Sequence, residues 1–265
     1  MNLLREISEI VYYWIIFFSK HKIALVIHLA AKTGVRNSIH CPLDYFDVNV
    51  NGSIRLLESM KKNNVKNLIF SSSSSVYGNQ TGKLVETEVP DNPVSPYAVS
   101  KRTVEMLNYN YHINENFKII NLRLFSVYGK NQRPDLALYK FIDLILKNNP
   151  IEIYGSLETT RDYTYINDVL KAIYSSIMLL NNNNNVYEII NIGSGNPVSL
   201  RQLIELIAKV TNQKKIKIVI TEFMKGDVRH THADIRKARE LLNFIPEISI
   251  ENGVRLFYDW YRSIN

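Results

Sequence analysis

The sequence has little cysteine and no long hydrophobic segment, and each shortage excludes a class of protein. Cys41 is the only cysteine in the 265 residues, so no disulfide can form within the chain, and a reducing compartment is favoured. The apolar run at residues 10–18 is far shorter than the roughly 20 residues of a membrane-spanning helix. A signal peptide is disfavoured because Glu6 and Glu9 precede this run and no small-residue cleavage site follows it. We therefore expect a cytoplasmic protein without a membrane span, whose residues 10–18 form a buried or interfacial helix.

Positive charge is present but is not arranged as in a nucleic-acid-binding protein. The net charge is +7, yet the lysines are scattered, with only short pairs such as Lys61–Lys62 and Lys214–Lys215. A nucleic-acid site is typically a basic stripe with interleaved aromatic residues, and none is seen. We expect anionic small molecules as ligands, no nucleic-acid partner and no metal site.

The first half of the chain alternates between strand-like and helix-like segments. Three apolar runs have the composition of strands: 24–31, which is typical of a parallel strand covered on both faces, 65–78, which ends in serines before VYG, and 117–129. A helical segment at 43–62 separates the first two, and a helix carrying Tyr97 separates the second and third. This alternation predicts an α/β fold with a parallel sheet, which binds ligands at its strand ends. Chemistry should therefore gather at Ser71–Tyr77, Tyr97 and Phe125–Gly129.

After residue 130 the pattern is less regular, and we expect a smaller second lobe. The predicted elements are a helix at 136–148, a strand at 151–155, the segment 161–180, a solvated asparagine loop at 181–185, a strand at 186–195 and an amphipathic helix at 198–211 with Ser199 as its cap. We assign 1–130 to a nucleotide-binding domain and 131–265 mainly to a substrate lobe, with some segments returning to the sheet.

The stretch PVSPYAVSK (93–101) carries the strongest chemical signal. Ser95 is a good N-cap, and Pro96 suits the first helical position, so a helix should begin here. Tyr97 and Lys101 are then one turn apart on the same face. A free phenol has a pKa of about 10, and bringing it near 7 takes roughly 4 kcal/mol of differential stabilisation, which a neighbouring ammonium can supply. The pair could thus form a base, although such a pair on a helix surface is often without function.

The order of the motifs identifies a family resemblance. VIHLAA, DVNVNG, FSSSSSVYG, SPYAVSK, LRLFSVYG, QRPD, RDYTYINDV, NIGSG and GDVRHTHAD follow one another as they do in the extended short-chain dehydrogenase/reductase family. Within that family the chain most resembles the nucleotide-sugar epimerases, and especially the UDP-glucuronate 4-epimerases. The resemblance implies a partial Rossmann-like, doubly wound parallel sheet, NAD as cofactor, a UDP-sugar substrate, a homodimer that pairs through helices including the one with Tyr97, and a role in polysaccharide biosynthesis.

The resemblance also implies roles for individual residues. In such an epimerase a hydride passes from sugar C4 to NAD⁺ and returns to the other face of a 4-keto sugar, so a base must take the C4 hydroxyl proton. The implied catalytic residues are Tyr97, Lys101 and Ser73; the implied cofactor-binding residues are Leu29, Ala30, Ala31, Asn49, Ser71, Tyr97 and Lys101; the implied substrate-binding residues are Ser74, Ser75, Ser126, Arg133, Arg161, Asp227 and Arg229. A strand-end cap for Ser73 and solvated charges for Arg161, Asp227 and Arg229 are the alternatives.

Neighbouring residues favour one reaction over its relatives. Related dehydratases carry an acidic pair just after the Ser73 position, and related decarboxylases carry a glutamate before VYG. Ser74 and Ser75 stand at these positions and cannot act as carboxylates, so epimerisation is favoured. By the same resemblance Arg133 faces the glucuronate carboxylate, for which a planar guanidinium is a bidentate donor. An ordinary surface arginine remains the alternative.

One family feature is missing from the sequence. No glycine precedes Gly34, so the GxxGxxG loop that lets main-chain N–H groups approach the NAD pyrophosphate is absent. VIHLAA would be the fourth strand of the family sheet, which makes it an exposed edge here. We therefore expect a truncated first half, and a chain that is inactive or impaired as it stands.

Two alternatives to a UDP-glucuronate epimerase stay open. The first is a pseudoenzyme or interaction subunit that retains UDP-sugar binding or dimerisation. The second is a UDP-hexosamine 4-epimerase, for which replacing Arg133 with leucine should leave turnover unchanged.

Overall fold

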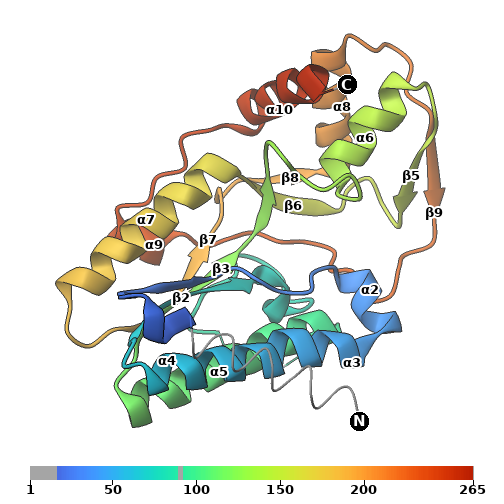
Figure 1. The fold of residues 1–265 in the computed structure, drawn as a ribbon. Coiled ribbons are helices and arrows are strands. Elements are labelled where there is room, and N and C mark those ends of the chain that lie inside the picture. Colours follow the sequence, from blue (N-terminus) through green and yellow to red (C-terminus); the bar gives the residue numbers. More distant parts are fainter. Residues whose placement is uncertain (1–16, 89–91, 265) are drawn as a thin grey trace. The chain divides into compact units, whose positions relative to one another are not determined.

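The computed structural model describes residues 17–88 and 92–264, which fall into two compact units (Figure 1). The described part of the first unit has three segments: 17–78, 92–123 and Ser176–Ile190. The second contains the segment after Gly78, then Leu124–Ser175 and the chain from Asn191 onward. The predicted helix at residues 10–18 lies mostly outside the described residues, although Phe17 and Phe18 are helical and Phe18 is buried.

A four-stranded sheet forms the centre of the first unit. Its order is β1-β2-β3-β7, and β1 runs parallel to β2 with Ile27 opposite Ile69. The strands are β1 (Val26–His28), β2 (Asn67–Ser73), β3 (Lys118–Leu124) and β7 (Tyr187–Ile192), whose last two residues belong to the second unit. The α/β class with parallel strands predicted from the sequence is confirmed.

Helices of the first unit pack on this sheet. They are α2 (Val35–His40), α3 (Pro42–Tyr45), the π-helix η1 (Phe46–Asn51), α4 (Gly52–Lys62), the 3₁₀ turn η2 (Ser74–Tyr77) and α5 (Pro96–Glu115). Figure 1 shows α4 and α5 side by side, and the two helices are in contact. They bury apolar side chains such as Leu57, Met60 and Val104 against Leu68 and Phe70 of β2, which makes one continuous core.

The first strand is shorter than predicted, but among the described strands it lies at the edge of its sheet, as the missing first half led us to expect. A strand at 24–31 covered on both faces was expected, but β1 has three residues, with Ile27 39% exposed and Leu29 55% exposed. The reason is its place at the edge of the four-stranded sheet, where β2 is its neighbour. Hydrophobic composition alone does not distinguish an edge strand from a central one.

The second unit contains two small sheets and a helical cluster. One sheet has the order β4-β6-β8, and β5 pairs in parallel with β9 in the other. The strands are β4 (Ser126–Tyr128), β5 (Ile151–Tyr154), β6 (Thr160–Tyr165), β8 (Pro197–Ser199) and β9 (Ile218–Thr221); the helices are α6 (Ala137–Leu146), α7 (Ile166–Asn182, which ends in the first unit), α8 (Leu200–Thr211), α9 (Arg236–Leu242) and α10 (Ile250–Ile264). Helix α8 contacts α6 and α10 around buried Phe141, Ile207 and Phe257.

The prediction of one strand at 117–129 was wrong. The chain forms β3, leaves the first unit after Arg123, and enters a different sheet as β4. Between them, Phe125 donates its main-chain N–H to the carbonyl of Ile192 at 3.0 Å. A continuous apolar sequence does not reveal this change of sheet, because the strand-like composition continues through both strands.

In the second half the predicted cap at Ser199 is confirmed, whereas the loop predicted for the asparagine run at 181–185 is only partly present. Ser199 and Gln202 form a capping box at the start of α8, as Ser199 predicted. Helix α7 continues through Asn182, so the predicted loop at 181–185 begins later. Lys118 binds this helix end by donating to the Leu180 carbonyl at 2.8 Å.

Candidate active site

The helix that carries Tyr97 and Lys101 begins where the sequence predicts. Ser95 has an extended backbone, and its hydroxyl accepts a hydrogen bond from the N–H of Ala98 at 3.2 Å. Pro96 is the first residue of α5. Tyr97 and Lys101 therefore occupy the first two turns of a helix whose start is fixed by its own cap.

The Tyr97 ring lies against a second tyrosine. Tyr97 is half-buried, and its ring meets that of Tyr45 edge to face, with centroids 6.2 Å apart. Tyr45 is almost fully buried and donates its hydroxyl to the carbonyls of Thr33 at 2.8 Å and Gly34 at 2.9 Å. A fixed aromatic wall therefore supports the predicted base.

Lys101 is buried and bonded to the main chain of β2. The residue is 2% exposed, and its ammonium donates to the carbonyl of Ser71 at 2.6 Å while lying 4.8 Å from the centre of the Phe70 ring. Burial lowers the pKa of Lys101 to about 8, against the opposing effect of the Glu105 carboxylate. Lys101 is therefore mostly cationic at pH 7, which is the form that favours a phenolate.

Ser73 ends β2 and caps the short turn η2. Its hydroxyl accepts hydrogen bonds from the N–H of Ser75 at 3.2 Å and from the Ser75 hydroxyl at 2.9 Å. Ser74 and Ser75 follow in η2, and both are half-buried. Helix α5 packs against β2 and η2, so the elements that carry Ser73, Tyr97 and Lys101 are in contact within one unit. Their catalytic roles remain predictions.

Four of the predicted cofactor residues lie in the loop after β1 and in η1, whereas Ser71 lies in β2 and Tyr97 and Lys101 lie in α5. Within Leu29–Ala31, the first two residues are exposed and the third is half-buried. Asn49 is buried and joins this loop to α5: its Oδ1 accepts from the N–H of Lys32 at 2.7 Å, and its Nδ2 donates to the Ser100 hydroxyl at 2.9 Å. Ser100 in turn donates to the carbonyl of Tyr97. The side chain of Asn49 thus holds the loop against the catalytic helix.

His28 is a member of this region that the sequence analysis did not single out. Its Nε2 lies 3.0 Å from the Ser53 hydroxyl, which donates its only proton to the carbonyl of Asn49 at 2.5 Å. Ser53 must therefore accept from His28, so the neutral ring carries its proton on Nε2. Burial, followed by the charge of Lys101, lowers the pKa of His28 to about 4.

The described residues fit only one end of a dinucleotide. Lys101 is a buried ammonium with three N–H donors, and its bond to Ser71 leaves donor capacity for a ribose hydroxyl. The pyrophosphate end has no matching loop, since the first glycine of the sequence is Gly34 and the helix after it, α2, has six residues. The residues present therefore fit a ribose of NAD, and the assignment to the nicotinamide ribose stays a prediction.

Two of the predicted substrate residues lie on β4 and the loop that follows it. Ser126 is half-buried and stands opposite Tyr163 in the parallel pairing of β4 with β6. The side chain of Arg133 is 50% exposed, and its guanidinium pairs with the carboxylate of Asp135, with Nε 3.2 Å from Oδ1. Arg133 is therefore accessible, but it already has an acidic neighbour.

The remaining predicted substrate residues lie near residues 227–229. Arg161 donates from Nη2 to the carbonyl of Val228 at 2.6 Å and from Nη1 to that of Arg229 at 3.2 Å, so its guanidinium braces this segment. Arg229 is exposed and stacks over the ring of Phe223 at 5.5 Å, and Asp227 is half-buried. The structure thus brings these three residues together within the second unit.

A buried carboxylate that the sequence analysis missed organises the same unit. Asp162 is fully buried, and its oxygens accept main-chain N–H bonds from Ser194 at 2.6 Å, Gly195 at 3.0 Å and Ala233 at 3.0 Å. It therefore ties the NIGSG and GDVRHTHAD motifs to β6. In the sequence, only its position beside Arg161 in the motif RDYTY pointed to a structural role for Asp162.

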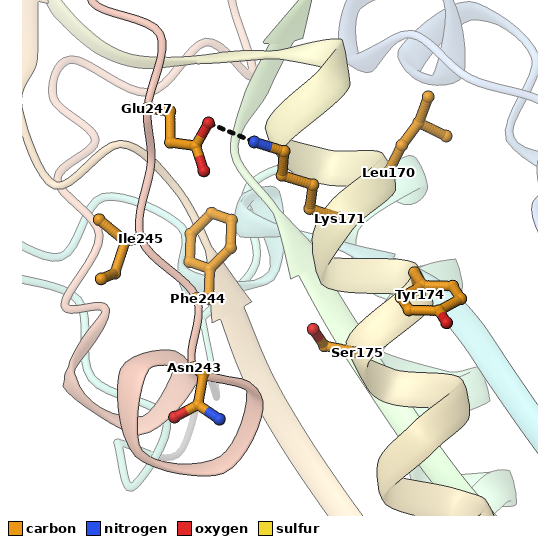
Figure 2. A pocket seen from close by; sticks show the side chains of 8 residues that line it. All are labelled: Leu170, Lys171, Tyr174, Ser175, Asn243, Phe244, Ile245 and Glu247. Carbon is orange, nitrogen blue, oxygen red and sulfur yellow. Dashed lines mark ion pairs between the residues drawn. The ribbon is translucent and has the colours of Figure 1, made fainter.

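A cavity of about 520 Å³ also lies in the second unit, away from all predicted site residues. Figure 2 shows its walls, formed by α7 and the segment after α9, with an ion pair between Lys171 and Glu247. Its lining residues are Leu170, Lys171, Tyr174, Ser175, Asn243, Phe244, Ile245 and Glu247. The cavity contains no arrangement of side chains that indicates chemistry.

The described residues contain neither a metal-binding cluster nor a membrane-spanning helix. In residues 17–88 and 92–264, no group of three or more His, Cys, Asp or Glu side chains is placed to hold a metal ion. Within the same ranges no helix has the length and apolar character needed to cross a membrane.

Comparison with known proteins gives one consistent result. The profile of the protein family described as GDP-mannose 4,6 dehydratase matches residues 15–257. The chain is 43% identical over 244 residues to a UDP-glucuronate 4-epimerase from Thermodesulfobacterium geofontis, a match that covers 92% of this chain and 74% of that protein.

Solved structures of similar proteins agree with this match. A UDP-glucuronic acid 4-epimerase from Bacillus cereus, solved with UDP-glucuronic acid and NAD, is 34% identical with a TM-score of 0.89, covering 95% of this chain and 79% of that one. A UDP-glucose 4-epimerase from Thermotoga maritima, solved with UDP-glucose, is 32% identical with a TM-score of 0.89, covering 96% and 82%. The family and fold resemblance inferred from the motifs is confirmed.

Proposed function

Because the chain belongs to the family described as GDP-mannose 4,6 dehydratase, and to its nucleotide-sugar epimerase branch, we propose that it catalyses the NAD-dependent 4-epimerisation of a UDP-sugar. The substrate we propose is UDP-glucuronate, with UDP-galacturonate as product. The observation that carries the proposal is the bond of the buried Lys101 ammonium to Ser71, which joins the helix of Tyr97 to the strand that ends at Ser73.

The family description names a dehydratase, but the residues after Ser73 favour epimerisation. Eliminating water across two sugar carbons requires an acid and a base placed at those carbons. Ser74 and Ser75 offer only hydroxyls at the two positions where such groups would stand. An epimerase needs one base at C4 and a partner for the C4 oxygen, and Tyr97 and Ser73 can provide these.

Three residues of the first unit carry the chemistry in this proposal. Tyr97, as phenolate, takes the proton of the C4 hydroxyl and later returns it. Lys101 keeps its positive charge one helical turn away, which favours the phenolate. The Ser73 hydroxyl donates to the C4 oxygen. Bound NAD⁺ supplies the acceptor for the C4 hydride and its return. General base catalysis of this kind contributes a factor of about 10² to 10⁴ in rate.

We propose that Arg133 selects the uronate by pairing with its carboxylate. The guanidinium is accessible and would exchange Asp135 for the substrate carboxylate, with the bidentate geometry that arginine provides. Arg229 and Asp227 are proposed contacts for the nucleotide, and Arg161 supports them by bonding the main chain of 228–229.

A neutral UDP-hexose or a UDP-hexosamine is the second candidate substrate. The existing pair between Arg133 and Asp135 favours this candidate, because a guanidinium that is already paired with a carboxylate is less available to bind the carboxylate of a charged sugar. The similar UDP-glucose 4-epimerase from T. maritima also supports this alternative.

We also propose a homodimer and a reducing compartment. Met106, Tyr109 and Ile113 recur at helical spacing on α5 and are each more than half exposed. An apolar stripe of this kind is suited to pairing with the same helix of a second copy. The single cysteine, Cys41, carries no disulfide, in keeping with a cytoplasmic location.

The proposed function is tested by incubating the chain with NAD⁺ and UDP-glucuronate deuterated at C4. The expected product is UDP-galacturonate that keeps its deuterium, because the hydride leaves and returns at the same carbon. The assay is repeated with the chain joined to a nucleotide-binding βαβ segment of a relative, which supplies a pyrophosphate loop. Loss of deuterium, or no epimer from the joined protein, refutes the proposal. Calorimetric binding of UDP without turnover in either form favours a non-catalytic binding protein.

A further inference from the structure

Glu105 occupies the helical turn after Lys101 and is fully buried. Its Oε1 accepts hydrogen bonds from the Ser72 hydroxyl at 2.6 Å and from Nε of Arg123 at 3.0 Å. Its Oε2 accepts from Nη2 of Arg123 at 2.9 Å and from Nη1 of Arg102 at 3.1 Å. A carboxylate with four donors is firmly oriented, because both of its oxygens are fixed by hydrogen bonds.

Two of these donors connect Glu105 to the predicted catalytic residues. Ser72 lies between Ser71, whose carbonyl accepts from Lys101, and Ser73, the proposed partner of the C4 oxygen. Arg123 extends from β3, and its guanidinium stacks 4.7 Å over the ring of Tyr77 in η2. The Glu105 carboxylate therefore fixes the end of β2 and the turn after it to α5.

We propose that Glu105, anchored by Arg123 and Ser72, is a positioning residue that holds the Lys101 ammonium protonated and in place at the end of β2. The role of Glu105 in catalysis rests on the proposed function, whereas its effect on Lys101 can be measured without any enzymatic activity. Tyr97, Lys101 and Glu105 then form a continuous row at four-residue spacing on α5: the base, the cation that favours its ionised form, and the anion that maintains the cation.

The direction of the electrostatic effect supports this role. Burial alone would lower the pKa of Lys101 further than about 8, and Glu105 opposes that shift. Burial would also lower the pKa of Arg123, but the hydrogen bonds that Arg123 donates to Glu105 raise it well above its ordinary value. Without Glu105, the buried Lys101 would lose the carboxylate that opposes the effect of burial, so its neutral form would gain.

Other charged groups near α5 do not replace Glu105. His28 of β1 is neutral at pH 7, because burial and the charge of Lys101 lower its pKa to about 4. The acidic side chains on the elements packed against α5 are directed elsewhere: Asp44 of α3 to Lys32, Asp47 of η1 to Asn51 and Arg55, and Glu58 of α4 to the Tyr111 hydroxyl. The basic side chains of α2, Arg36 and His40, are exposed, and Tyr77 of η2 faces Arg123.

The test is a direct titration of Lys101 that needs no turnover. The protein is labelled with ¹³C at the lysine ε-carbon, and the Lys101 resonance is assigned from its absence in Lys101→Met. In Glu105→Gln we expect the pKa of Lys101 to fall by about one unit or more. Ser72→Ala removes one of the four donors but no charge, so this pKa should fall much less than in Glu105→Gln. Arg102→Gln removes a cation from the same carboxylate and should not lower it.

Loss of Glu105 leaves Arg123 buried without its partner, so the single variant could fail to fold. The double variant E105L/R123M removes both charges and leaves no buried ion unpaired, and it should also lower the pKa of Lys101. An unchanged pKa of Lys101 in the folded variants, or an equal fall in Ser72→Ala, overturns the proposal whether or not the chain is an epimerase. If epimerisation is observed, the alkaline limb of kcat should move to lower pH together with the titration, while Arg102→Gln keeps the original profile.

Discussion

The ammonium of Lys101 donates a 2.6 Å hydrogen bond to the main-chain carbonyl of Ser71, two residues before the end of β2. This bond joins the helix that carries the proposed base to the strand that carries the proposed hydroxyl partner. Because the side chain is buried, its position is fixed by packing against Phe70 as well as by the hydrogen bond. Lys101 is therefore held in place by the chain itself.

The clearest prediction concerns the phenol of Tyr97. Tyr97→Phe removes the base but keeps the ring that packs against Tyr45. We expect kcat for epimerisation to fall by about 10² to 10⁴, with an unchanged thermal unfolding midpoint. The control is Tyr109→Phe, which changes an exposed tyrosine on the same helix. Equal activity of Tyr97→Phe and the wild type would exclude Tyr97 as the base.

Local features of the fold could be read from the sequence because they depend on a few neighbouring residues. Ser95 and Pro96 predicted the start of α5, and Ser199 predicted the start of α8. The strand predicted at 65–78 is present as β2, although it ends at Ser73, where that side chain caps the turn η2. Caps and strand ends are set by hydrogen bonds within a few positions, so their signal is local.

Features that depend on distant partners could not be read in this way. The change of sheet at Phe125 depends on the carbonyl of Ile192, and nothing in the apolar run at 117–129 indicates it. The burial of Glu105 depends on Arg123, which arrives from β3, whereas a glutamate on a helix is usually exposed. The sequence shows that Glu105 follows Lys101 by four residues. It does not show that Glu105 is buried, because the burial depends on its pairing with Arg123 of β3.

The low pKa of His28 predicts a specific loss of stability in acid. The folded state holds this pKa at about 4, below its ordinary value of 6.5, so the unfolded state binds more protons between these values. The contribution of His28 is fully present above about pH 6.5 and is lost as the pH falls toward 4, by up to about 3 kcal/mol. His28→Gln, which can still donate to Ser53, should show a smaller loss of unfolding free energy between pH 7 and 4.5 in urea titrations. Parallel losses in both proteins would contradict this.

Two helical glycines should respond to alanine with opposite signs. A Cβ at Gly52 would make only an ordinary contact with the Asp47 carbonyl, so Gly52→Ala should stabilise the fold by about 0.5–1 kcal/mol. A Cβ at Gly253 would lie 1.8 Å from the hydroxyl of buried Tyr128, so Gly253→Ala should destabilise it by about 1–3 kcal/mol despite better helix propensity. Urea unfolding measures both, and a stabilised Gly253→Ala would contradict the close packing of Tyr128.

The exposed face of α5 can be tested by adding charge to it. Introducing glutamate at both Met106 and Ile113 would place carboxylates in the proposed apolar interface, where their desolvation is unfavourable. We expect the mass measured by light scattering to fall from that of a dimer to that of a monomer of 30.7 kDa. The same substitution at exposed Asn184 should leave the mass unchanged. A monomeric wild-type protein would refute the dimer.

The choice between a charged and a neutral sugar depends on Arg133. If its guanidinium binds the uronate carboxylate, Arg133→Leu should lower kcat/KM for UDP-glucuronate at least about tenfold, since a charged hydrogen-bonded pair is worth roughly 1.5–3 kcal/mol. Arg133→Lys keeps the charge but loses the bidentate geometry, so its kcat/KM should lie between those of the wild type and Arg133→Leu. Asp135→Asn frees the guanidinium from its present partner and should lower KM rather than raise it. If Arg133→Leu turns over UDP-glucuronate as fast as the wild type, Arg133 is a surface residue and the neutral UDP-sugar becomes the better candidate substrate.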